Sequence, residues 1–178
     1  MKIAIAGKMG SGKSYLADII VEKFHYQKAA FAGRVKELAS ELFGMENKDR
    51  DLLINFATKM REIDASVWIR SMLRFSDHFT DVVVDDLRLQ NEYETLKSQD
   101  WIIVKMEVSE DVREERLRKK YVETFDSHKE HFDSITENDV VNLPDDKFNM
   151  VIRNDKDIQL FINMIATLNN KIIKNVLI

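Results

Sequence analysis

The chain has 178 residues, enough for one well-buried core and too few for two ordinary domains. Hydrophobic residues make up 44% and charged residues 33%, a balance typical of a soluble globular protein. A net charge of −4 argues against polymeric nucleic acid or a membrane as a partner, and the absence of cysteine excludes disulfides and thiol nucleophiles. The N-terminal apolar run is too short for a signal peptide, so we expect a cytoplasmic location, in the host cell if the source is viral.

A phosphate-binding loop lies near the N-terminus. The motif G-x-x-x-x-G-K-[ST] occurs as Gly7–Ser14, after the apolar run Ile3–Ala6 and before a helical pattern over residues 14–25. Its glycines let successive backbone N–H groups point at phosphate oxygens. Lys13 would reach the β- and γ-phosphates, and Ser14 would ligate Mg²⁺. The sequence therefore predicts binding of a nucleoside triphosphate. The residues expected to contact it are Lys8, Met9, Gly10, Ser11, Gly12, Lys13, Ser14 and Tyr15.

Strand-like and helix-like segments alternate along the chain, as in a parallel sheet with helices on both faces. We expect strands at residues 2–6, 28–31, 81–85, 101–108 and 148–152. Helical patterns occupy 14–25, about 35–42, most of 50–78, 92–97 and 158–172, with Gly44 placed to cap the second of them. The predicted fold is a three-layer α/β domain spanning residues 1–178, with about five parallel strands. A charged helix and loop over about 109–134 has the composition of a lid.

The loop alone does not distinguish kinases from GTPases or from motor and transport ATPases. A guanine-reading Asn-Lys-x-Asp motif is missing, because in Asn47–Arg50 the aspartate comes one place early. Arginines beyond the loop favour a small kinase, which must neutralise both the transferred phosphoryl group and an anionic acceptor. These arginines are Arg61, Arg70, Arg74, Arg88, Arg113, Arg116 and Arg118.

The stretch Asp85–Arg88 is a second candidate for chemistry. It follows the Val82–Val84 run, at the strand end where open α/β sheets bind their ligands. An acidic residue there can hold Mg²⁺ through water, and Arg88 can bind a phosphate. The alternative is an aspartate that caps a helix beside a surface arginine.

The segment Asp86-Leu87-Arg88-x-x-Asn91-Glu92 resembles the D-x-R-x-x-x-E element of phage-type deoxynucleoside monophosphate kinases, within the P-loop nucleoside monophosphate kinase superfamily. Further segments are similar to other parts of that family: Phe31–Glu37, Thr58–Arg61 with Trp68, Ser134–Glu137 and Met150–Asp155.

This resemblance implies a P-loop kinase fold and ATP- and Mg²⁺-dependent phosphoryl transfer to a (deoxy)nucleoside monophosphate. It implies that a helical region at about 33–78 binds the acceptor and that the lid closes over the transferring group. The implied catalytic residues are Lys13, Asp86, Arg88, Arg113 and Arg116, the last two in the lid. The implied acceptor contacts are Lys36, Arg61, Asp86 and Arg88, with Ser14 and Asp86 beside the metal. Asn154 and Asp155 would form the loop against the adenine.

Two other functions stay open at this point. One is a P-loop kinase of another small metabolite, such as dephospho-coenzyme A or phosphomevalonate. The other is a nucleotide-gated binding module whose charged flap contacts a protein. The sequence also leaves open the acceptor base and sugar, a homodimer, and a viral or cellular source.

Overall fold

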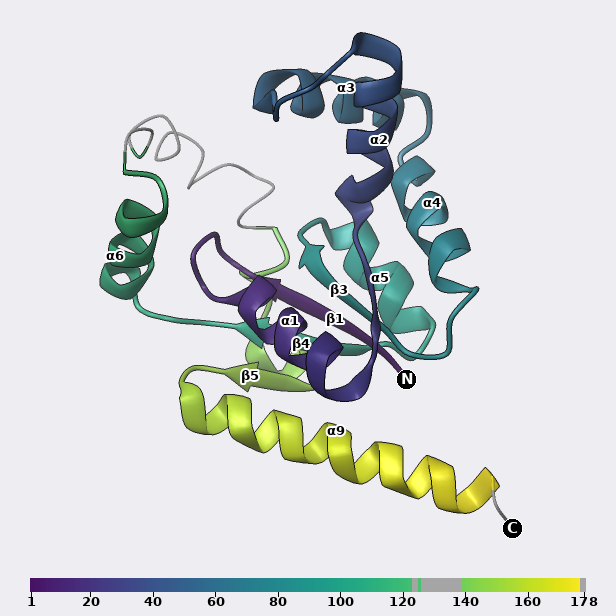
Figure 1. The fold of residues 1–178 in the computed structure, drawn as a ribbon, viewed down its shortest axis with the longest axis vertical. Helices are drawn as coiled ribbons and strands as arrows, with labels where there is room; N and C mark the ends of the chain where they lie inside the picture. The colour runs from purple at the N-terminus through teal and green to yellow at the C-terminus, as the bar shows by residue number, and fades with distance from the viewer. Residues whose placement is uncertain (123–124, 126–138, 177–178) are drawn as a thin grey trace.

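This computed structural model describes residues 1–122, 125 and 139–176. Within them, five parallel strands form one sheet in the order β2-β3-β1-β4-β5, as Figure 1 shows in part. The strands are β1 Lys2–Gly7, β2 Gln27–Ala29, β3 Val82–Leu87, β4 Ile102–Met106 and β5 Met150–Ile152. The helices are α1 Lys13–Phe24, α2 Phe31–Phe43, α3 Arg50–Ile63, α4 Val67–Ser76, α5 Gln90–Ser98, α6 Glu110–Lys120, the 3-10 turn Asp145–Lys147 and α9 Asp155–Val176.

The central strand β1 shows how the sheet comes to be covered on both faces. Ile3 and Ile5 point to one face and pack with side chains of α1 and α9. Ala4 and Ala6 point to the other face, among side chains of α4 and α5. All four are 0% exposed, which is why this strand reads as a continuous apolar run. The expected three-layer arrangement is confirmed.

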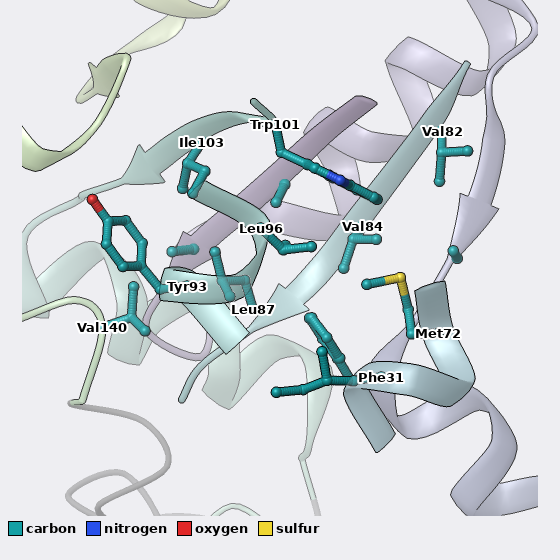
Figure 2. Close-up of a cluster of buried hydrophobic side chains, with 14 of the residues drawn as sticks. Phe31, Met72, Val82, Val84, Leu87, Tyr93, Leu96, Trp101, Ile103 and Val140 are labelled. Atoms are coloured by element: carbon teal, nitrogen blue, oxygen red, sulfur yellow. The ribbon is translucent and has the colours of Figure 1, made fainter. Parts of the chain in front are cut away.

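The core on the α4–α5 face is shown in Figure 2. Val84 of β3 lies between Leu96 of α5 and Met72 of α4, and the indole of Trp101 fills the adjoining space. Phe31, the first residue of α2, joins the same core. The first turn of α2 is therefore anchored to the sheet.

Helices α2, α3 and α4 share a small core of their own. Val35, Ala57 and Trp68 meet there, and the Trp68 indole N–H donates a hydrogen bond of 3.1 Å to the Ala57 carbonyl. Gly44 ends α2 with φ 64°, the left-handed conformation expected of a glycine cap. Because α2 begins directly after β2, the three-helix arm of α2, α3 and α4 leaves the carboxyl edge of the sheet through α2, and α4 returns along the face of the sheet (Figure 1).

Two boundaries differ from the sequence prediction. Phe31 begins a helix instead of ending a strand, because the Asp86 carboxylate accepts hydrogen bonds from the N–H groups of Phe31 and Ala32 and starts α2 there. Strand β3 continues to Leu87, which pairs with Ala6 of β1 beyond a register shift. Asp86 is therefore inside the strand and not after it. Among the described helices, none has the length and apolar character needed to cross a membrane.

Candidate active site

The loop between β1 and α1 curls at the carboxyl end of the central strand. Gly10 and Gly12 have φ of 80° and 102°, in the left-handed region that favours glycine. The Lys13 side chain is buried, and its ammonium donates hydrogen bonds to the Gly7 carbonyl and, at 2.9 Å, to the Lys8 carbonyl. These bonds hold a positive charge inside the curl of the loop.

Two hydroxyl groups of the loop differ in their surroundings. The Ser14 side chain is exposed at the start of α1, where a ligand can reach it. Ser11 is 1% exposed, and its Oγ has no hydrogen-bond partner among the described residues. A buried polar atom without a partner costs free energy unless a ligand or water completes its bonding.

Helix α6 packs against the outside of this loop. The Arg113 guanidinium is buried, and its Nε–H donates a 2.9 Å hydrogen bond to the Met9 carbonyl. Arg116 reaches the carbonyls of Gly10 and Ser11, each at 3.4 Å. A Cβ added to Gly10 would lie 3.1 Å from the Arg113 carbonyl, a tight contact, so the close approach of α6 adds to the preference for glycine set by the φ of 80°. Both arginines, expected over the transferring group, lie against the backbone of the loop.

A cavity of about 420 Å³ opens beside the loop. It brings together five of the residues predicted to bind the nucleotide, Ser11, Gly12, Tyr15, Asn154 and Asp155, and Arg116 of the predicted lid. The other lining residues were not predicted as site residues from the sequence; they are Met106, Val108, Ile152, Arg153 and Ile158. A signal for them existed, because β4 and β5 end at the same edge of the sheet as β1 and must place their last residues beside the loop.

The side chain of Asn154 caps its own helix. Its Oδ1 accepts hydrogen bonds from the N–H groups of Lys156 and Asp157, at 2.9 and 3.1 Å, and so starts α9 at Asp155. The helix thus begins earlier than residue 158, where the sequence pattern placed it. Asn154 and Asp155 both line the cavity.

The two aspartates at the end of β3 have separate partners. Both oxygens of Asp86 accept hydrogen bonds of 3.0 Å from the first turn of α2, so this aspartate binds the start of a helix distant in the sequence and is not itself an N-cap residue. Burial raises the pKa of Asp86, and the two N–H groups act in the opposite direction. Asp85 forms an ion pair of 3.1 Å with Lys28, whose ammonium also lies 2.8 Å from Asp18 of α1.

Basic side chains from five parts of the fold lie near the C-terminal end of α6. The Lys48 ammonium is partly desolvated, and this desolvation, followed by the nearby cations, lowers its pKa. We call these residues the cationic cluster: Lys36 of α2, Lys48 of the α2–α3 connection, Arg50 of α3, Arg88 after β3 and Lys120 of α6. Lys36 and Arg88 were predicted acceptor contacts. Lys48, Arg50 and Lys120 were not selected from the sequence as site residues, because only the tertiary fold brings them near Lys36 and Arg88.

Arg61, the remaining predicted acceptor contact, lies near this region. Burial raises the pKa of the Glu92 carboxyl group. The nearby charge of Asp86 adds to this rise, and the charge of Arg61 opposes it. In the part of the chain that the structure describes, no three histidine or acidic side chains are grouped as a metal site. Mg²⁺ in nucleotide sites is held largely by phosphates and water, so one hydroxyl and one carboxylate are a sufficient protein contribution.

Comparison with known proteins places this geometry in a family. Residues 3–135 match the family described as AAA domain, and the chain belongs to it. A comparison with curated proteins gave no match. Among solved structures, the deoxyadenosine kinase of M. mycoides is 17% identical, with a TM-score of 0.55 over 94% of this chain and 100% of that chain.

Two further structures have the same arrangement. The shikimate kinase of Bacteroides thetaiotaomicron is 16% identical, with a TM-score of 0.51 over 93% of this chain and 98% of that chain. TT1252 from Thermus thermophilus is 15% identical, with a TM-score of 0.56 over 94% and 96%. These likenesses show that the chain has the P-loop kinase fold, as the sequence predicted.

Proposed function

We propose that this protein transfers the γ-phosphoryl group of ATP to a nucleoside monophosphate, preferentially a deoxynucleotide, giving the diphosphate and ADP. The observation that carries the proposal is a pair of anion-binding groups at one edge of the sheet. The Gly7–Ser14 loop is one, and the cationic cluster is the other. Helix α6 connects them, because Arg113 lies on the loop and Lys120 belongs to the cluster. These residues are seven apart, about 10 Å along a helix, a separation that suits donor and acceptor phosphates meeting between them.

The donor nucleotide fits the loop and the cavity beside it. Lys13 and the loop N–H groups would hold the β- and γ-phosphates, and the unpartnered Ser11 hydroxyl has the chemistry to complete that cradle. Mg²⁺ would be held by Ser14, with Asp86 acting through water, and would supply charge neutralisation at the β- and γ-phosphates. Tyr15, Arg116 and the backbone of Asn154 and Asp155 would enclose the adenine, together with apolar side chains at the ends of β4 and β5.

The acceptor would lie between the three-helix arm, our proposed acceptor-binding region of about residues 33–78, and α6. Lys36, Arg61 and Arg88, joined by Lys48 and Arg50, provide more positive charge than a neutral alcohol needs, which favours a phosphorylated acceptor. The M. mycoides deoxyadenosine kinase, solved with dCMP and dCDP, is consistent with a nucleotide in this fold.

Such an acceptor needs no general base. A phosphate oxygen is already a nucleophile, so positioning and neutralisation of charge provide most of the rate acceleration. Closure of the proposed lid, about residues 109–134, would exclude water from the transfer. Its described part is chiefly α6; residues 123–124 and 126–134 lie outside the described residues, as does the family-like segment Ser134–Glu137.

The test is ADP production from Mg-ATP with each common NMP and dNMP supplied separately. Dephospho-coenzyme A and phosphomevalonate serve as rival acceptors, and Lys13→Ala as the inactive variant. Strong stimulation by one or a few deoxynucleotides, lost in Lys13→Ala, would support the proposal. ATP turnover that no nucleotide accelerates would overturn it, and stimulation by a rival acceptor would redirect it to another metabolite.

A further inference from the structure

The turn that carries Arg88 is closed by a buried acid. Glu92 lies in the first turn of α5 and is 3% exposed. Its Oε2 accepts hydrogen bonds from the backbone N–H groups of both Arg88 and Leu89, each at 3.0 Å. The Leu89 bond is an ordinary helix-capping interaction. The Arg88 bond holds the backbone one residue before the N-cap residue Leu89. It therefore fixes the position of the backbone from which the Arg88 side chain extends.

The surroundings of Glu92 connect it to the proposed acceptor site. Asp86 of β3 faces it from the sheet and Arg61 of α3 from the three-helix arm. On the other side of the same turn, Asp139 accepts a 2.8 Å hydrogen bond from the Gln90 N–H. Burial raises the pKa of Glu92 to about 7, with Asp86 adding to the rise and the two N–H groups and Arg61 opposing it. Near neutral pH the protonated and ionised forms are therefore both present, and the property common to both is an oxygen that accepts hydrogen bonds.

We propose that Glu92 is a positioning residue for acceptor binding: by accepting the Arg88 and Leu89 N–H groups, it fixes the backbone from which Arg88 reaches the acceptor phosphate. This inference rests on the proposed function, in which Arg88 contacts that phosphate. Glu92 itself is buried beneath the turn and acts through Arg88. A residue that only capped α5 would affect stability and leave the balance between substrate affinity and turnover unchanged.

The kinetic test compares Glu92→Ala with Glu92→Gln and with Glu94→Ala, an exposed glutamate two residues along the same helix. Glu92→Ala removes the acceptor of two partly buried N–H groups, so we expect the acceptor KM to rise roughly tenfold while the ATP KM changes less than about twofold. Glu92→Gln keeps an acceptor oxygen of the same reach, and it should restore the acceptor KM to within about threefold of wild type. Glu94→Ala should behave as wild type. Equal acceptor KM values in all four proteins would overturn the proposal.

A second measurement does not depend on activity. Amide hydrogen exchange at Arg88 and Leu89, followed by NMR, should accelerate in Glu92→Ala and stay slow in Glu92→Gln and Glu94→Ala. If Glu92→Ala fails to fold, Glu92→Gln still decides, because an acceptor KM raised tenfold despite slow exchange at both amides would overturn the positioning role. A wild-type protein that phosphorylates no nucleotide contradicts the proposed function instead, and the exchange experiment still shows whether Glu92 fixes the turn.

Discussion

Lys13 is the residue on which the proposed chemistry depends most. Its ammonium is held by the Gly7 and Lys8 carbonyls at the place where the donor phosphates would lie. We expect Lys13→Ala to lower acceptor-stimulated ADP production by about 10²–10⁴-fold, because it removes charge stabilisation of the transferring phosphoryl group. Lys23→Ala, an exposed lysine in the last turn of the same helix, is the matched control and should keep full activity. Comparable losses in both variants would contradict the role of Lys13.

The raised pKa of Glu92 predicts that the free energy of unfolding depends on pH. Its pKa is raised from 4.5 to about 7, so between these values the folded protein keeps a proton that the unfolded chain has released. The contribution of Glu92 to the free energy of unfolding is therefore complete below about pH 4.5, and it is lost as the pH rises through about 7. Glutamine does not titrate, so Glu92→Gln lacks this loss. Relative to wild type, its free energy of unfolding should rise by up to about 3 kcal/mol between pH 4.5 and 8.

Urea unfolding of both proteins across this pH range measures the difference. Glu94→Gln, which changes an exposed glutamate on the same helix, controls for general charge effects. A stability difference between wild type and Glu92→Gln that stays constant with pH would show that Glu92 does not titrate in this range.

Helix α6 holds the phosphate-binding loop, because its arginines donate hydrogen bonds to carbonyl groups of the loop. Arg113 contacts the Met9 carbonyl, so in the proposed function it would act on the nucleotide through the shape of the loop. We expect Arg113→Met, which keeps much of the side-chain volume but loses this hydrogen bond, to raise the ATP KM roughly tenfold. Lys119→Met, on the exposed side of the same helix, is the control. If Arg113→Met changed kcat alone, a direct contact with the transferring group would be the better account.

The cationic cluster predicts that acceptor binding depends on charge and on salt concentration. Lys48 faces Lys36, Arg50, Arg88 and Lys120, so its removal weakens the attraction for an anionic acceptor. We expect Lys48→Ala to raise the acceptor KM several-fold at low ionic strength, with a smaller effect as added salt screens the charges. Titrating the acceptor at two salt concentrations measures this.

Lys59→Ala is the matched control, since Lys59 belongs to α3 and is paired with Glu62. A rise in the ATP KM with an unchanged acceptor KM would assign the cluster to the donor side.

For the whole molecule, the sequence was sufficient where local pattern decides structure. The loop motif and the run Val82–Val84 predicted the central strands because buried parallel strands need continuous apolar residues. The start of α2 was not predictable from neighbouring residues. It depends on Asp86, whose carboxylate binds the N–H groups of Phe31 and Ala32 across more than fifty positions of sequence.

The candidate site divides in the same way. Residues of the loop are adjacent in sequence, so the motif identified them together. Lys48 and Lys120 carry no motif, and they gain a shared role only when the three-helix arm and α6 face the same space. Glu92 was part of a quoted sequence element, but its partners became visible only in the folded turn.

The proposed phosphoryl acceptor is a nucleoside monophosphate. Following the γ-phosphoryl group of ATP shows directly whether this acceptor receives it. The protein would be incubated with Mg²⁺ and γ-³²P-labelled ATP together with each deoxynucleoside monophosphate, and the labelled products separated. We expect label in the corresponding diphosphate, with its transfer lowered by about 10²–10⁴-fold in Lys13→Ala. Label released only as inorganic phosphate, at a rate that no nucleotide changes, would contradict it.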